Sequence, residues 1–405
     1  MRVLLLAYGS RGDVEPMVGL ALALRSAGAE VRFCAPPDFA ELLADSGLPL
    51  VPLGRSLREM AREAVLGTGP AMTMQERAAR VTADTYAAAL PAAEGCDAVV
   101  ATGLMPAAAA ARAVADRLGV PYSFVAYFPS YLPSPDHPPL PWPGHPLPPE
   151  ETDNRVLWER NEQVLDELFG GAVNAHRESV GLPPVEHVRP LVLTDRPLLA
   201  ADAVLSPWRP TGELDVVQTG AFARPDARPL PAALEAFLTA GEAPVYVGFG
   251  SMPVRDAEAV ARDAVAAVRA QGRRVLLSRG WAGLAAEEAA DLHVVDEVNQ
   301  QELFGRVAAV VHHGGAGTTT TAARAGVPQV LVPQLADQPY WARRVAELGI
   351  GVAHDGPVPS FDSLSAALAA ALTPETAARA KELAATLRTD GAATAARLLL
   401  AGHRA

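Results

Sequence analysis

The sequence predicts an α/β protein with two Rossmann-like, doubly wound domains that face each other across a cleft. Short, fully apolar runs alternate with alanine-rich segments of helical spacing, and this alternation starts twice, at residue 3 and again at residue 244. Continuous apolar strands that alternate with helices are typical of a parallel sheet covered on both faces. The 405 residues are enough for two or three domains with sizeable cores.

The first series predicts a βαβ opening followed by further strands and helices. Its expected elements are, in order, a strand at 3–7, a helix at 17–27, strands at 30–35 and 98–102, a helix at 107–118, a strand at 122–126 and a helical stretch at 154–180. Prolines crowd residues 129–149 so densely that neither a helix nor a central strand is tenable there. We expect that segment to be a long surface loop.

The second series predicts another doubly wound domain. Its expected elements are a strand at 244–251, a helix at 257–271, a strand at 274–278, an apolar strand at 307–311 and a helical tail at 375–401. Residues 220–231 carry Arg and Pro without periodicity and indicate a linker. We therefore predict a first domain at 1–223, a linker at 224–240, a second domain at 241–385 and a C-terminal helical tail at 386–405.

Composition excludes several classes of protein. The net charge of -12 argues against binding of nucleic acid, which needs an excess of Lys and Arg. The two cysteines, Cys34 and Cys96, stand in apolar surroundings and indicate neither a disulfide framework nor a metal site. The apolar start is short and lacks a cleavage site, and no segment is long enough to span a membrane. We expect a cytoplasmic monomer.

The most informative motif is HHGGAGTT at residues 312–319, which follows an apolar strand and precedes a helix. A glycine turn that opens a helix frees backbone N–H groups at the positive end of the helix dipole, where a diphosphate can bind. The imidazole of His313 and the hydroxyls of Thr318 and Thr319 would add donors, whereas His312, beside the strand end, is expected to pack in the core.

A second polar pair follows the next apolar strand. Asp337 and Gln338 could bind the hydroxyl groups of a sugar. A loop that donates hydrogen bonds to phosphate, followed by a pair that binds sugar hydroxyls, indicates a nucleotide-sugar site. The same pair could instead cap the helix that begins near Pro339.

These motifs resemble those of the GT-B family of inverting, natural-product glycosyltransferases, and most of all the bacterial enzymes that glycosylate glycopeptide aglycones. The similarity covers essentially the whole chain and is carried by GSRGDVEP at 9–16, GFGS at 248–251, VNQ at 298–300, the 312–319 loop and DQP at 337–339. Sterol and macrolide glycosyltransferases share several of these motifs.

The resemblance implies a role for each matching residue. The donor diphosphate would be held by Ser251, His313, Gly315, Gly317 and Thr318; the nucleoside by Arg279, Trp281, Val298 and Gln301; and the donor sugar by Asp337 and Gln338. Ser10 and Arg11 would lie on the phosphate or acceptor side, although they could equally complete a turn, and Arg11 could instead pair with a neighbouring carboxylate. The first domain would bind the acceptor and the second the nucleotide sugar.

The resemblance also implies that Asp13 is the catalytic base. Many members of the family carry a histidine in Gly-His-x-x-Pro, and here Asp13 occupies that place before Pro16. The base removes the acceptor proton while the hydroxyl attacks the anomeric carbon. The alternative is that Asp13 only caps the helix near Pro16, a role worth about 1 kcal/mol. No Asp-x-Asp cluster indicates a metal site, and no cofactor is expected besides the co-substrate, a UDP- or dTDP-sugar.

The acceptor implied by the resemblance is a large natural-product aglycone. Four aromatic residues around the proline-rich loop, Tyr127, Phe128, Tyr131 and Trp142, either contact a flat acceptor or only anchor the loop on the sheet. The same reaction on a polyketide, macrolide or sterol remains open, as does a catalytically silent helper that binds nucleotide sugar. A Rossmann oxidoreductase is disfavoured because no Gly-x-Gly-x-x-Gly follows the first strand.

Overall fold

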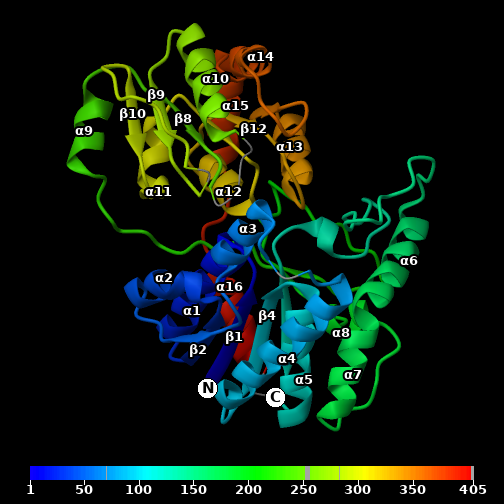
Figure 1. Ribbon diagram of the computed structural model, residues 1–405. Helices are drawn as coiled ribbons and strands as arrows, with labels where there is room; N and C mark the ends of the chain where they lie inside the picture. Colours follow the sequence, from blue (N-terminus) through cyan, green and yellow to red (C-terminus); the bar gives the residue numbers. More distant parts are fainter. Residues whose placement is uncertain (70, 251–255, 282, 403–405) are drawn as a thin grey trace. The chain divides into compact units, whose positions relative to one another are not determined.

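The structure is a computed structural model that describes residues 1–69, 71–250, 256–281 and 283–402, and it divides into two compact units (Figure 1). The first comprises Met1–Ala203, Pro207–Arg224 and Thr389–Ala405, and the second comprises Val204–Ser206 and Pro225–Arg388. Each unit contains one parallel sheet with helices on both faces, the arrangement that the alternating apolar runs predict. Among the described residues, no helix is long and apolar enough to cross a membrane.

The first unit has a seven-stranded parallel sheet in the order β3-β2-β1-β4-β5-β6-β7. Its strands are β1 (Arg2–Tyr8), β2 (Glu30–Ala35), β3 (Leu50–Pro52), β4 (Ala98–Gly103), β5 (Tyr122–Ala126), β6 (Leu198–Leu199) and β7 (Val217–Gln218). Its longer helices are α1 (Arg11–Ser26), α2 (Ala40–Asp45), α3 (Leu57–Leu66), α4 (Met74–Ala93), α5 (Met105–Leu118), α6 (Asn154–Leu165), α7 (Gly171–Ser179), α8 (Val188–Leu193) and α16 (Gly391–Ala401). Alternate residues of β1, such as Leu4 and Leu6, pack with the alanine-rich faces of α4 and α5 in one buried cluster.

The second unit has a six-stranded parallel sheet in the order β10-β9-β8-β11-β12-β13. Its strands are β8 (Val245–Gly248), β9 (Val275–Ser278), β10 (Leu292–Val295), β11 (Ala309–His312), β12 (Gln329–Leu331) and β13 (Gly351–Ala353). Its helices are α9 (Ala232–Thr239), α10 (Ala257–Ala270), α11 (Gln300–Leu303), α12 (Ala316–Arg324), α13 (Gln338–Glu347), α14 (Phe361–Ala371) and α15 (Pro374–Ala384). Successive residues of β8 enter opposite cores, because Val245 and Val247 pack against α10 and α14 whereas Tyr246 packs with α9 and Phe304.

Helix α1 begins a turn and a half earlier than the spacing of apolar residues predicts. It starts at Arg11 rather than at residue 17, because Ser10 and Asp13 form a capping box. Asp13 is therefore the third residue of the helix and not its N-cap. The alternative of an N-cap was wrong, because Ser10 is the N-cap and Asp13 takes part in the capping box from the first turn.

Two segments expected to be irregular are more ordered than the sequence predicts. The predicted linker contains α9, whose Leu234 and Leu238 are buried in the second unit. The proline-rich loop is not wholly a surface loop, because Leu132 and His137 are buried and the His137 carbonyl accepts a hydrogen bond from Trp158 Nε1 at 2.9 Å.

The helical stretches at 154–180 and 375–401 are each interrupted. A π-helical turn at Asp166–Gly170 joins α6 to α7. In the tail, α15 belongs to the second unit, whereas α16, red in Figure 1, packs against α1 of the first.

Candidate active site

The loop between β11 and α12 contains the predicted anion site. Gly315 is the N-cap of α12, and no side chain caps the first turn of this helix. The side chain of Thr319 is fully buried and its hydroxyl donates to the Gly315 carbonyl at 2.9 Å, so the expectation that Thr319 offers a donor was wrong. Thr318 is half-buried, and its hydroxyl makes no hydrogen bond with another described residue. The helix start therefore leaves backbone N–H groups and one hydroxyl available.

The His313 ring lies in a slot between two glycines of the second unit. A Cβ at Gly315 would lie 2.6 Å from His313 Nε2, and a Cβ at Gly250 would lie 3.0 Å from its Cε1. Within the described residues, the buried Nδ1 of His313 has no hydrogen-bond partner. Burial lowers the pKa of His313 from 6.5 to about 4, so the ring is neutral at neutral pH. A neutral imidazole with an unsatisfied nitrogen is suited to donate one hydrogen bond to an anion.

His312 has a structural role in the same loop. Its Nδ1 accepts from the Gly314 backbone N–H at 3.1 Å, and this contact places the ring proton on Nε2, 2.9 Å from Gln329 Oε1. The side chain is fully buried, and burial lowers the pKa of His312 to about 3. The imidazole thus fixes the path of the loop between β11 and α12.

Asp337 is directed toward the start of α12. It occupies the N-cap position of α13, yet its side chain makes no capping hydrogen bond, and Oδ2 instead accepts from Trp341 Nε1 at 2.9 Å. Burial raises the pKa of Asp337 from 3.8 to about 6, while hydrogen bonds from Trp341 and from the Ala316 backbone favour the ionised form. The alternative of a side-chain cap is therefore wrong for Asp337.

Gln338 holds the loop that precedes α13. The side chain is buried, and its Oε1 accepts from the backbone N–H groups of Gln334 at 2.7 Å and Leu335 at 3.2 Å. Its amide NH₂ group is the part that remains for a ligand hydroxyl.

The four residues predicted near the nucleoside follow β9 and β10. Arg279 is exposed, and its guanidinium lies 3.7 Å from Asp296 Oδ1. The Trp281 backbone N–H donates to the Gly250 carbonyl at 2.9 Å, which ties this loop to the end of β8. Val298 packs at the edge of the core, and Gln301 is exposed on α11. Ser251 lies outside the described residues.

The order of the strands arranges these candidates in a row. Residues after β10 and β9 are those predicted for the nucleoside, residues after β8 and β11 those for the diphosphate, and residues after β12 those for the sugar. The strands are parallel neighbours, so all these loops emerge from one edge of the sheet, about 4.8 Å apart. Ligands of open α/β sheets bind at that carboxyl edge.

Asp13 lies at the corresponding edge of the first sheet, after β1. Its Oδ2 accepts from the Ser10 backbone N–H at 2.8 Å, and the Ser10 hydroxyl accepts from the Gly12 N–H at 3.2 Å. A Cβ at Gly9 would lie 2.1 Å from Asp13 Oδ2, so only glycine leaves room for the carboxylate there. Ser10 thus completes the helix start.

Arg11 pairs with a neighbouring carboxylate, one of the roles considered for it. Its Nε lies 2.6 Å from Glu15 Oε2, and Arg224 Nε lies 3.1 Å from the other oxygen of Glu15. Glu15 is thereby held between two guanidinium groups.

Three of the four aromatic candidates gather beside Asp13. The Tyr127 hydroxyl donates to the Asp13 carbonyl at 2.9 Å, and the Tyr131 hydroxyl donates to the Gly103 carbonyl at 3.1 Å. Burial, and secondarily the Asp13 charge, raise the pKa of both phenols well above the usual value. Phe128 meets Tyr131 edge-on at 5.7 Å. Trp142 packs elsewhere, edge-on against Phe169 at 5.4 Å.

Sequence reasoning assigned no role to Gly250, although it forms one wall of the His313 slot. Its position two residues after the end of β8, the strand next to β11, is the signal that would have found it. In the described part of the chain, no three His, Cys, Asp or Glu side chains come together in a way that could hold a metal ion.

Comparison with known proteins agrees with this architecture. The glycosyltransferase family 28 N-terminal domain matches residues 3–134, and the erythromycin biosynthesis protein CIII-like C-terminal domain matches residues 284–397. The solved structure of the glycotransferase of kitacinnamycin covers 99% of this chain and 98% of its own, with a TM-score of 0.72 at 22% identity. Two parallel doubly wound sheets of this kind define the GT-B class of glycosyltransferases.

Sequence identity places the chain within that class. It is 57% identical to the vancomycin aglycone glucosyltransferase of Amycolatopsis orientalis over 405 residues, which cover 99% of this chain and 97% of that protein. It is 52% identical to the dTDP-epi-vancosaminyltransferase of the same organism, covering 94% of this chain and 92% of that protein. The chain therefore belongs to the GT-B family of natural-product glycosyltransferases and is itself a glycosyltransferase.

Proposed function

We propose that this protein is an inverting, metal-independent glycosyltransferase that moves a hexose from a UDP- or dTDP-sugar to a hydroxyl of a glycopeptide aglycone. The observation that carries the proposal is the row of candidates along the carboxyl edge of the second sheet, in the order nucleoside, diphosphate, sugar. The relatives support both substrates: one is named for the vancomycin aglycone, which supports the acceptor, and another for a dTDP-sugar, which supports the donor.

In this reaction the leaving diphosphate needs its developing charge stabilised. The N–H groups at the start of α12 and the neutral His313 donate to the phosphate oxygens in a preorganised slot. Asp13 removes the proton of the acceptor hydroxyl as this oxygen attacks the anomeric carbon from the side opposite the diphosphate. Asp337 and the Gln338 amide orient the hexose.

The test is a mass-spectrometric screen of UDP- and dTDP-sugars against glycopeptide, macrolide, polyketide and sterol aglycones. The expected result is a one-hexose mass gain on a glycopeptide aglycone. A gain only on another scaffold would refute the acceptor. Tight binding of nucleotide sugars with no product on any aglycone would favour the helper protein instead.

Gly317→Ala separates folding from phosphate binding. In the structure, a Cβ at Gly317 meets nothing within 4 Å, and alanine favours a helix by about 1 kcal/mol over glycine. We expect the thermal midpoint to rise slightly. The added methyl group occupies the space before the first turn of α12, so the affinity for the nucleoside diphosphate should fall about tenfold or more. Unchanged affinity, measured by calorimetry, would contradict the diphosphate role of this turn.

Asp337→Asn should weaken binding of the intact donor but not of the free nucleoside diphosphate, because the proposed partner of Asp337 is the sugar. A carboxylate accepts stronger hydrogen bonds than an amide does, and burial raises the pKa of Asp337 to about 6. The difference in donor affinity between wild type and Asp337→Asn should therefore be largest above pH 6 and shrink as the pH falls below it. Calorimetry at several pH values checks this, and a difference that does not depend on pH would refute it.

A further inference from the structure

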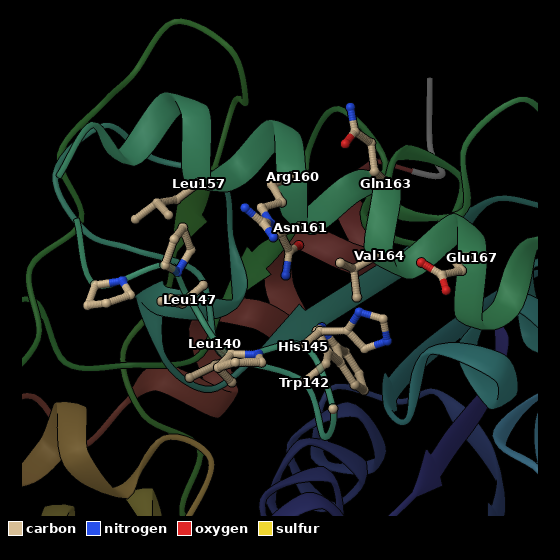
Figure 2. A pocket seen from close by; sticks show the side chains of 14 residues that line it. Leu140, Trp142, His145, Leu147, Leu157, Arg160, Asn161, Gln163, Val164 and Glu167 are labelled. Atoms are coloured by element: carbon tan, nitrogen blue, oxygen red, sulfur yellow. The ribbon is translucent and has the colours of Figure 1, made fainter. Parts of the chain in front are cut away.

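A pocket of about 410 Å³ lies in the first unit, between the proline-rich loop and α6 (Figure 2). One wall is a single face of the helix, formed by Leu157, Arg160, Asn161 and Val164, and it continues to Glu167 on the π-helical turn. The opposite wall is the loop from Leu140 to Pro149, including Trp142 and three prolines. Its volume is in the range of small-molecule binding pockets.

Asn161 is the polar group at the centre of this pocket. The residue is 8% exposed, and its side-chain amide makes no hydrogen bond with another described residue. Figure 2 shows this amide directed from α6 toward the loop that carries Trp142 and His145. The amide lines the pocket and is not sealed from solvent, so it is available to a ligand that supplies one donor and one acceptor. A peptide group is such a ligand.

The apolar part of the pocket suits an aromatic ring. Trp142 is fixed by its edge-on contact with Phe169 and by the bridge between Trp142 and His145. Leu140, Leu147 and Val164 complete a surface without charge. An aromatic ring gains both burial and favourable geometry beside a fixed indole.

The helical wall of the pocket carries two opposite charges. Arg160 and Glu167 are exposed, and neither forms an ion pair with another described residue. They are seven positions apart, which is about 10 Å along the helix axis. An extended peptide covers that distance with about three residues.

We propose that this pocket binds an aromatic, peptide-linked part of the acceptor, with an acidic group toward Arg160 and a basic group toward Glu167. This inference rests on the proposed function, because it makes the pocket a specificity site for a peptide aglycone. Chain continuity supports it, since the loop that begins beside Asp13 at Tyr127 reaches the pocket at Leu140.

The test uses Asn161→Leu, which removes the amide and keeps similar volume, and Glu159→Leu, a matched control at an exposed position of α6 that does not line the pocket. The probe is the dipeptide tyrosyl-tyrosine, compared with alanyl-alanine, in calorimetry on the full chain. We expect the wild type and Glu159→Leu to bind the aromatic dipeptide, and Asn161→Leu to bind it about tenfold more weakly. A thermal melt reports that each variant is folded, and nucleoside diphosphate binding reports that the second unit is unaffected.

Kinetics with the aglycone provide the second readout. Asn161→Leu should raise the KM for a glycopeptide aglycone about tenfold, with kcat and the donor KM unchanged. Equal dipeptide affinity in wild type and Asn161→Leu, or no binding to the wild type at millimolar concentration, overturns the pocket assignment. Asn161-dependent dipeptide binding without an effect on the aglycone KM overturns its role for the acceptor. If dipeptide binding depends on Asn161 but the wild type glycosylates no aglycone, the proposed function fails and the pocket assignment stands.

Discussion

Asp13→Asn should lower kcat by about 10²–10⁴, the usual effect of losing a general base, while the fold and the donor affinity survive. The Oδ2 atom of Asp13 accepts the Ser10 backbone N–H at 2.8 Å, and an amide oxygen can accept the same hydrogen bond. The helix start is therefore preserved, and only the basicity is lost. Steady-state kinetics with the aglycone, together with a thermal melt, measure the two effects separately.

A structural role for Asp13 alone predicts the reverse pattern. Asp13→Asn would then turn over normally, and Asp13→Ala would cost about 1 kcal/mol of stability through the lost capping box. Gly9→Ala is a further check, because it keeps the Asp13 carboxylate but moves it. The added Cβ would displace this carboxylate, so kcat should fall as well. Glu15 is a poor substitute base because Arg11 and Arg224 both hold it.

The bounds of two mostly buried strands could be predicted closely from the sequence. The predicted strands at 30–35 and 122–126 have the bounds observed for β2 and β5, because a short, largely apolar segment between turns has few alternatives inside a parallel sheet. The start of α1 could not be found from apolar spacing, since its first turn is held by the hydrogen bonds of Ser10 and Asp13. The pattern Ser-x-x-Asp was the available signal.

In the candidate site too, the sequence pattern predicts where a loop lies but not which side-chain contacts form there. The strand-turn-helix pattern located the loop at His313, but it could not show that Thr319 is used within the helix or that Asp337 bonds to Trp341. Those contacts depend on which elements become neighbours in three dimensions. The pocket at Asn161 was missed for the same reason, because its two walls come from separate segments and the π-helical turn beside it has no clear sequence signature.

The second large effect is expected for His313→Ala, which should weaken binding of both the nucleotide sugar and the free nucleoside diphosphate. A hydrogen bond to a charged group contributes about 1.5–3 kcal/mol, which corresponds to about 10–150-fold in affinity. His313→Gln keeps an N–H donor and should recover part of the loss. Calorimetry with the nucleoside diphosphate measures all three proteins, and unchanged affinity in a folded His313→Ala variant would exclude the proposed contact.

The acid stability of His313→Ala tests the same environment without any ligand. The pKa of His313 is about 4 in the folded protein against 6.5 for the unfolded chain, so the unfolded state binds more protons between these values. The wild type should therefore lose stability as the pH falls from about 6.5 to about 4, and His313→Ala should lose less over that range. His312, whose pKa is lowered to about 3 by burial and secondarily by His313, adds a similar dependence to both proteins, and this part is smaller in His313→Ala because His313 no longer acts on it. An identical loss in the two proteins would show that the imidazole is not held neutral in its glycine-walled slot, and hence that it is not positioned as a buried neutral donor for the diphosphate.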